Sequence, residues 1–205
     1  MVIESFLKNI ITGDEMWVYG YDVETKIHLS QWMGKGSPWP KIARMSWSKI
    51  KVMLVVFFDW KGIVHHEFVP HGLMVNKQFY QEVLVHLRDA VGGKRPELWE
   101  NQTWMLHHDN ALAHASLLIC IYLAKHQTSI VPHPSYSPDL FFLFPKLKTT
   151  LKGCHFQTIE EIRENAIREL HAITGSVFQE AFQQWMKRWE WCITSREDYF
   201  KGGSA

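Results

Sequence analysis

Residues 49–70, KIKVMLVVFFDWKGIVHHEFVP, decide the fold class of this chain. The run 49–59 is almost continuously apolar and has the length of a buried strand, whereas residues 62–70 alternate between apolar and polar side chains. A tight turn at Trp60, Lys61 and Gly62 would join the two runs. We therefore predict an antiparallel hairpin of two strands.

The segments on either side of this hairpin also have clear periodicities. Residues 10–21 are rich in aromatic and β-branched side chains, which predicts a strand before the hairpin. After it, Asn76 fits the N-cap of a helix that runs to about Val91 and stops at Gly92 and Gly93. The remaining expected elements are a strand at 103–109, a helix at 111–125, a strand at 130–132, a proline-rich turn at 132–140 and two closing helices with capping boxes at Thr158/Glu161 and Ser176/Gln179.

The order of these elements is strand, strand, strand, helix, strand, helix, strand, helix, helix. Three antiparallel strands followed by alternating helices and strands predict an α/β fold, a ribonuclease H-like mixed sheet with helices on both faces. A flavodoxin-like sheet would alternate from its first strand. We expect residues 1–205 to form a single domain.

Composition excludes several protein classes. Hydrophobic residues make up 46% of the chain and charged residues 21%, which suits a globular core and excludes a disordered chain. The formal charge of +1 neither requires nor forbids a polyanionic partner. Three cysteines without a C-x-x-C pair disfavour a disulfide framework and a Cys-rich zinc site. No run approaches the ~20 apolar residues of a membrane span, so we expect a soluble intracellular protein with no membrane partner.

Asp14 and Asp109 form the first candidate site. Asp14 lies in the first predicted strand and Asp109 ends the fourth, and these strands are neighbours in a sheet of this order. Two carboxylates on adjacent strands would suit a hard divalent ion next to a phosphate. On spacing alone, however, two turn or capping acids are the simpler interpretation.

Further motifs favour the metal site over simple turn or capping acids. They follow one order along nearly the whole chain. They are TGDE at 12–15, KVMLVVFFD at 51–59, GIVHHEFVP at 62–70, RPELWEN at 95–101, HHDNA at 107–111, PHPSYSPDL at 132–140, FPKLK at 144–148 and YF at 199–200. Together these motifs resemble mariner-type transposases, and also the transposase part of SET-domain fusion proteins. The resemblance implies a catalytic domain for DNA transposition, that is, endonucleolytic cleavage and strand transfer with Mg²⁺ or Mn²⁺.

The resemblance also implies roles for single residues. Asp14 matches the metal-binding aspartate that bridges two ions, and Asp109 matches the second catalytic aspartate. The family has its third acid in a segment resembling SPDLAPxDFFLFPKLK, whereas here Leu140 passes directly into Phe141, as if four residues were deleted. Asp139 aligns with the earlier aspartate of that turn, so it is a weak substitute ligand and more simply a turn cap. We expect the second metal site to be lost and cleavage to be weak or absent.

A basic, Trp-containing arm at about 22–48 is the best local basis for DNA contact. Lysines and arginines would neutralise phosphates there, while tryptophans could stack on bases or pack on a second subunit. The resemblance implies a homodimer through this arm, and the simpler alternative is a solvated loop without a partner. The proposed DNA-binding residues are Lys35, Lys41, Arg44, Lys49 and Lys51, with Lys146 and Lys148 from a second acid-free run.

Twelve histidines raise the question of zinc. Adjacent histidines on a strand point to opposite faces, so His107 and His108 offer at most one of their two rings to the Asp109 side, and a structural zinc site is disfavoured. Most of these rings are therefore expected to pack or hydrogen-bond. Near Asp109 we expect Asn110 and His114 to lie just outside the metal ligands, with His114 as a hydrogen-bond donor.

Three functions remain open from the sequence. The first is a mariner-type catalytic domain, impaired by loss of its third acid. The second is a non-catalytic DNA-binding or dimerisation module from a decayed transposase, and the third is a decayed fragment without any partner. The resemblance implies helix-turn-helix modules that precede such a domain and that we expect to be absent here, a nuclear location, and DNA rather than a small molecule as substrate.

Overall fold

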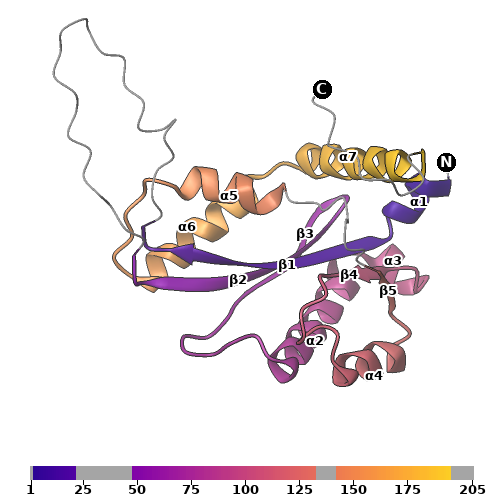
Figure 1. Ribbon diagram of the computed structural model, residues 1–205, viewed down its shortest axis with the longest axis horizontal. Helices are drawn as coiled ribbons and strands as arrows, with labels where there is room; N and C mark the ends of the chain where they lie inside the picture. The colour runs from indigo at the N-terminus through magenta and orange to yellow at the C-terminus, as the bar shows by residue number, and fades with distance from the viewer. Residues whose placement is uncertain (1, 22–47, 133–141, 195–205) are drawn as a thin grey trace, which may run out of the picture.

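The computed structural model describes residues 2–21, 48–132 and 142–194, which form a five-stranded mixed sheet covered by helices (Figure 1). The strand order is β3-β2-β1-β4-β5. The strands are β1 (Ile10–Tyr19), β2 (Lys51–Asp59), β3 (Gly62–Phe68), β4 (Met105–His107) and β5 (Ser129–Val131).

The strand pairing agrees with the predicted α/β fold. β2 pairs antiparallel with both β1 and β3, so the hairpin is confirmed. β4 pairs parallel with β1, and β5 pairs parallel with β4. Three antiparallel strands thus precede the parallel part of the sheet, as expected for a ribonuclease H-like domain.

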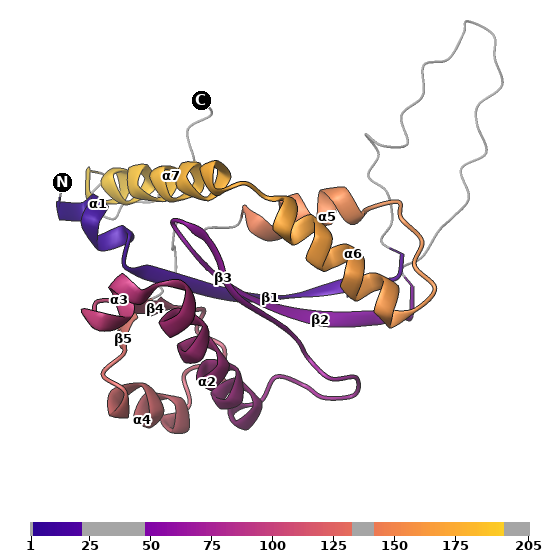
Figure 2. The ribbon, with the colours of Figure 1, turned by 180° about the vertical axis from the view of Figure 1, so that it is seen from behind.

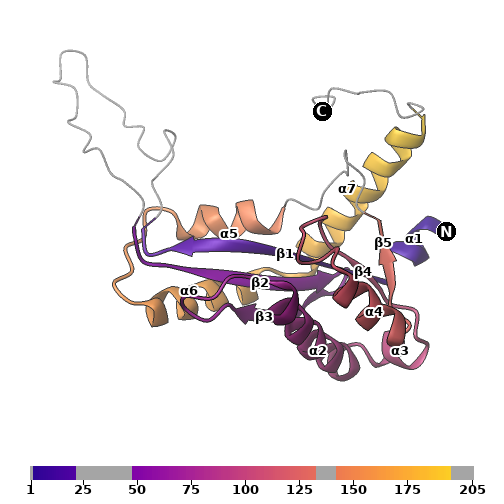
Figure 3. The same cartoon turned by 60° about the horizontal axis from the view of Figure 1, so that its bottom comes forward.

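Helices cover both faces of the sheet (Figures 1 and 2). Figure 3 shows α2 beside β3. One layer contains α2 (Lys77–Lys94), α3 (Pro96–Glu100) and α4 (Leu117–Lys125). The other contains α5 (Leu143–Leu151), α6 (Ile159–Ala172) and α7 (Gly175–Thr194), and α1 (Val2–Leu7) packs against α7. None of the helices in the described part of the chain is long and apolar enough to cross a membrane.

Two hydrophobic cores follow from strand alternation. On β1, Ile10, Met16 and Val18 face the α5–α7 layer, where Phe178, Phe182 and Trp185 of α7 are almost completely buried. Ile11 faces the opposite layer and joins the stripe on α2 formed by Val83, Leu84, Leu87 and Val91.

Helix α2 starts as predicted but ends later. The Asn76 side chain accepts hydrogen bonds from the N–H groups of Gln78 and Phe79, so it is the N-cap. The expected stop at Gly92 and Gly93 is wrong, because the helix continues to Lys94. Arg95 precedes Pro96, and a residue before proline is disfavoured in helical conformation, which places the end there.

Other helix predictions needed correction too. α4 begins at Leu117 rather than 111, and the short helices α1, α3 and α5 were not predicted. Thr158 is confirmed as an N-cap that accepts from the Glu161 N–H, but Ser176 lies inside α7, which begins at Gly175. The proline-rich turn lies almost wholly outside the described residues.

A buried ion pair joins the hairpin turn to the start of α3. Asp59 accepts from Arg95 Nε at 2.6 Å and from Nη2 at 2.9 Å, and it also accepts from the N–H groups of Lys61 and Gly62. The side chains of Asp59 and Arg95 are 2% and 12% exposed. The aspartate therefore fixes the turn and orients Arg95 at once.

Candidate active site

The parallel pairing of β1 with β4 positions the two predicted catalytic aspartates. Thr12 lies opposite His107 in the register, and Asp14 and Asp109 each follow two residues later. A hydrogen bond of 2.9 Å between Thr12 Oγ1 and His107 Nδ1 reinforces this register. Both aspartates are therefore placed past the same end of the paired segment, on neighbouring chain segments.

Gly13, the residue before Asp14, lets a side chain of β2 pack against the backbone of β1. A Cβ atom on Gly13 would lie 2.3 Å from Cε1 of Phe57, a buried ring on β2. Only glycine lets this ring pack directly on the backbone of β1. Packing of the Phe57 ring thus explains why a glycine precedes Asp14 in the TGDE motif.

Asp14 and Glu15 lie on opposite faces of the sheet. The Asp14 carboxylate is half-buried and accepts from the Glu15 backbone N–H at 2.8 Å. Strand alternation puts Asp14 on the face of Thr12 and Met16, toward the α5–α7 layer, whereas Glu15 faces the α2 side. The two acids of TGDE therefore belong to different surroundings.

His114 connects Asp109 to Glu15. Its Nδ1 lies 2.7 Å from Asp109 Oδ1, and its Nε2 lies 3.1 Å from Glu15 Oε1. Ionised carboxylates only accept hydrogen bonds, so both contacts are satisfied at once when the imidazole carries two protons. The Ala111 N–H also donates to Asp109 Oδ1 at 3.0 Å.

This network shifts the pKa values of its members. Burial disfavours the His114 imidazolium, but the carboxylates of Glu15 and Asp109 outweigh burial and hold the pKa of His114 above its ordinary value of 6.5. Burial also disfavours the Asp109 carboxylate, but the Ala111 N–H and the His114 imidazolium outweigh it and hold the pKa of Asp109 below 3.8. The network therefore favours the charged forms of both His114 and Asp109.

Two rings enclose the His114 imidazole. The Tyr80 ring centroid lies 3.9 Å from that of His114, and the His108 ring is stacked on His114 at 5.2 Å. The Tyr80 hydroxyl lies 2.7 Å from His108 Nδ1. Burial, together with the charges of Glu15 and Asp109, raises the pKa of Tyr80 well above 10, so the phenol stays protonated.

The sequence pointed to only part of this arrangement. His114 does contact Asp109, but it lies in a turn before α4 rather than in the expected helix, and Asn110 is exposed next to Asp109. Glu15 and Tyr80 were missed as site residues. The acid pair in TGDE was the available signal for Glu15, whereas nothing local to Tyr80 on α2 indicated its position.

The weak substitute ligand of the sequence analysis, Asp139, is not placed by the structure. Asp139 and residues 133–141 are not among the described residues. Within the described ranges, Asp14 and Asp109 belong to no set of three His, Cys, Asp or Glu side chains with ligand atoms within 4.8 Å of one another.

Some of the predicted DNA-binding residues can be placed. Lys35, Lys41 and Arg44 lie outside the described residues, while Lys146 and Lys148 are exposed on α5. Lys49 and Lys51 are exposed, and they line a groove of ≈ 290 Å³. Arg163 of α6 and Trp17 of β1 line the same groove, and the sequence analysis did not predict a DNA-binding role for either residue. The Lys51 ammonium lies 4.0 Å from the centroid of the Trp17 ring.

Comparison with known proteins finds similarity to mariner transposases along nearly the whole chain. The family described as "Transposase (partial DDE domain)" matches residues 22–101. The Mariner Mos1 transposase of Drosophila mauritiana is 29% identical over 203 residues, which are 97% of this chain and 58% of that protein. The human histone-lysine N-methyltransferase SETMAR is 25% identical over 96% of this chain and 29% of its own length. This chain therefore spans well under two thirds of each relative.

Solved structures agree with these similarities. The Mos1 mariner paired end complex with Mn superposes with a TM-score of 0.85 at 29% identity, covering 98% of this chain and 59% of that one. The catalytic domain of Mos1 mariner transposase gives a TM-score of 0.76 at 27% identity, covering 98% of this chain and 88% of that chain. The similarity thus extends over nearly all of the isolated catalytic domain.

Proposed function

Because the chain is a catalytic domain of the mariner transposase type, we propose that it descends from an enzyme that cuts and joins DNA through metal-dependent phosphodiester chemistry at Asp14 and Asp109. The observation that carries this proposal is the parallel register of β1 and β4. It brings the two aspartates of the family motifs to one end of the paired strands.

The donor set fits a hard divalent ion. Carboxylate oxygens are the ligands that Mg²⁺ and Mn²⁺ prefer, and paired end complexes of Mos1 are known with Mn and with Mg. Asp14 and Asp109 would hold the ion, which when bound polarises the phosphodiester and stabilises charge on the attacking and leaving oxygens. His114 fixes one oxygen of Asp109 by hydrogen bonding, and Glu15 fixes His114 in turn.

We further propose that this copy cleaves DNA poorly. The sequence passes from Leu140 to Phe141 where the family motif has four more residues, the last of which is the third acid. Loss of one carboxylate removes a ligand and a negative charge, so a second ion would bind much more weakly. Asp14 and Asp109 then remain of the three catalytic acids in the family motif.

A plasmid-nicking assay with Mg²⁺ or Mn²⁺ tests this proposal. We expect little nicking by the wild-type chain, and a gain when the residues APSD are inserted between Leu140 and Phe141. The matched control is an APSN insertion, which restores the length without the carboxylate and should stay inactive. Strong wild-type nicking that Asp14→Ala abolishes would show that the site needs no restoration.

The second candidate is a non-catalytic DNA-binding or dimerisation module. The grouping of Lys49, Lys51 and Arg163 around one groove favours DNA contact, because three cations there can displace counterions from phosphates. We expect binding to DNA to weaken as salt rises, and the double change Lys49→Gln with Lys51→Gln to flatten that dependence. A salt-independent affinity would remove DNA from this candidate.

The same proposal includes the partners and the compartment. Mos1 forms paired end complexes, so we propose DNA and a second copy of this chain as partners, with the arm at 22–48 as the dimer contact. Activity on DNA would place the protein in the nucleus. Sedimentation of the chain with and without residues 22–48 tests the role of the arm.

A further inference from the structure

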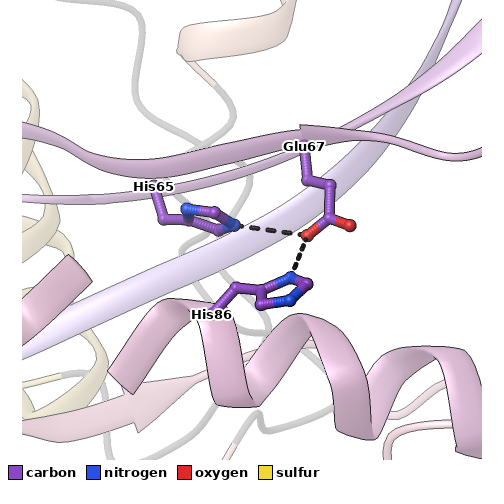
Figure 4. Close-up of side chains that lie close together, drawn as sticks. All are labelled: His65, Glu67 and His86. Atoms are coloured by element: carbon purple, nitrogen blue, oxygen red, sulfur yellow. Dashed lines mark hydrogen bonds and ion pairs between the residues drawn. The ribbon is translucent and has the colours of Figure 1, made fainter. Parts of the chain in front are cut away.

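A cluster of two histidines and a glutamate lies on the α2 side of the sheet, formed by His65 and Glu67 of β3 and His86 of α2 (Figure 4). Glu67 Oε2 lies 3.3 Å from His65 Nε2 and 3.0 Å from His86 Nδ1. One ligand atom from each residue lies within 4.8 Å of the other two. We propose that this cluster is a binding site for a transition-metal dication of the zinc class.

Strand periodicity explains why His65 belongs to the cluster and His66 does not. His65 and Glu67 are two residues apart on β3, so they share the face that α2 covers. His66 points to the other face, where its ring lies 5.5 Å from that of His171 on α6. The expectation that neighbouring histidines diverge is confirmed, and the third ligand comes from a helix that the sequence argument did not consider.

The distances suit a tetrahedral ion. Zinc binds imidazole nitrogen and carboxylate oxygen at about 2.0–2.2 Å, so two ligands of one tetrahedral ion are about 3.3–3.5 Å apart. The His65–Glu67 separation falls in that range, and the His86–Glu67 separation is slightly shorter. The His86 side chain is 53% exposed on the surface of α2, so it has room to adjust when an ion binds.

The ligand types also give this cluster a different metal preference from that of Asp14 and Asp109. Two imidazoles and one carboxylate favour Zn²⁺, Co²⁺ or Ni²⁺ over Mg²⁺, which prefers oxygen ligands only. Three protein ligands leave a fourth position for water. The Phe57 and His65 rings stack at 6.4 Å, which places an apolar wall beside the site. A bound ion would tie β3 to α2.

Titration of the tag-free chain with Co²⁺ and Zn²⁺ in excess Mg²⁺ tests the proposal. The excess Mg²⁺ occupies all-oxygen sites, and the visible absorbance of Co²⁺ reports tetrahedral nitrogen–oxygen coordination. We expect one equivalent of Co²⁺ that Zn²⁺ displaces. His86→Ala should weaken its affinity at least about tenfold, since removing even an indirect support of a metal site costs 10–100-fold.

His66→Ala is the matched control, because it removes a histidine from the same strand but from the opposite face. It should keep the bound equivalent, whereas Glu67→Gln should lose it. Zn²⁺ should also raise the unfolding temperature of the wild type and of His66→Ala but not of His86→Ala. Circular dichroism of each metal-free variant checks folding. Absence of the Co²⁺ band in the wild type, or equal affinity in His86→Ala, would overturn the proposal and leave the cluster as a hydrogen-bonded trio.

Discussion

The imidazole of His114 lies 2.7 Å from the Asp109 carboxylate and links it to Glu15 on the neighbouring strand. His114 is almost fully buried, whereas about half of the Asp109 side chain is exposed. The buried ring thus holds an exposed carboxylate in place. Positioning of this kind makes Asp109 available to a ligand from solvent at low entropic cost.

Replacing His114 by Gln should weaken both the fold and the metal site. The change leaves Glu15 and Asp109 without their shared cation, which we expect to cost about 1–3 kcal/mol of unfolding free energy. Mn²⁺ affinity should fall as Asp109 loses its orientation. Urea unfolding and Mn²⁺ titration measure the two effects. Equal Mn²⁺ affinity in wild type and His114→Gln would contradict a positioning role.

The stability of the metal-free protein should depend on pH through the same pair. The pKa of His114 is raised, so its contribution is complete below 6.5 and is lost as the pH rises through the folded-state pKa. The pKa of Asp109 is lowered, so its contribution is present above 3.8 and is lost as the pH falls through its folded-state pKa. With EDTA present, the stability gap between wild type and His114→Gln should be largest at about pH 6 and shrink as the pH rises through the folded-state pKa of His114. A constant gap would argue against the imidazolium.

The buried pair of Asp59 and Arg95 should matter far more than a nearby exposed pair. Arg95→Met leaves the Asp59 carboxylate buried without its partner, which we expect to cost about 3–5 kcal/mol. Lys61 and Glu97 pair at the surface, where both side chains are more than half exposed, so Lys61→Ala should cost no more than about 1 kcal/mol. Similar losses in the two variants, measured by urea unfolding, would contradict this ranking.

The two predicted capping boxes can be compared directly. Thr158→Ala removes the acceptor of the Glu161 N–H and should lower the unfolding free energy by about 1 kcal/mol. Ser176 lies inside α7 and its hydroxyl contacts Thr174, so Ser176→Ala should change stability by less than about 0.5 kcal/mol. A larger loss from Ser176→Ala would mean that this serine caps the helix after all.

The strands were predictable because their side-chain period is strong. β1 to β3 carry long apolar or alternating runs, and the order of elements then required β4 to lie next to β1. Short helices lack such a signal: α1 has six residues and α3 five. The start of α4 was misplaced because Asp109 accepts from the Ala111 N–H and a turn follows before Leu117.

For the candidate site, the sequence predicted the order of the strands but not the side-chain contacts. The order of the strands was enough to pair β1, which carries Asp14, with β4, which Asp109 follows. The contact from His114 to Glu15 spans 99 residues, so no local pattern could show it. The His65, Glu67 and His86 cluster likewise depends on how α2 packs on β3, which a strand pattern does not specify.

We propose that Asp14 and Asp109 form a divalent-metal site that has lost its third carboxylate. Counting bound Mn²⁺ by electron paramagnetic resonance, with and without the APSD insertion, tests it most directly. We expect one weakly bound Mn²⁺ in the wild type, lost in Asp14→Asn and in Asp109→Asn, and tighter binding or a second ion after the insertion. Two tightly bound ions in the wild type, or binding that neither substitution alters, would contradict it.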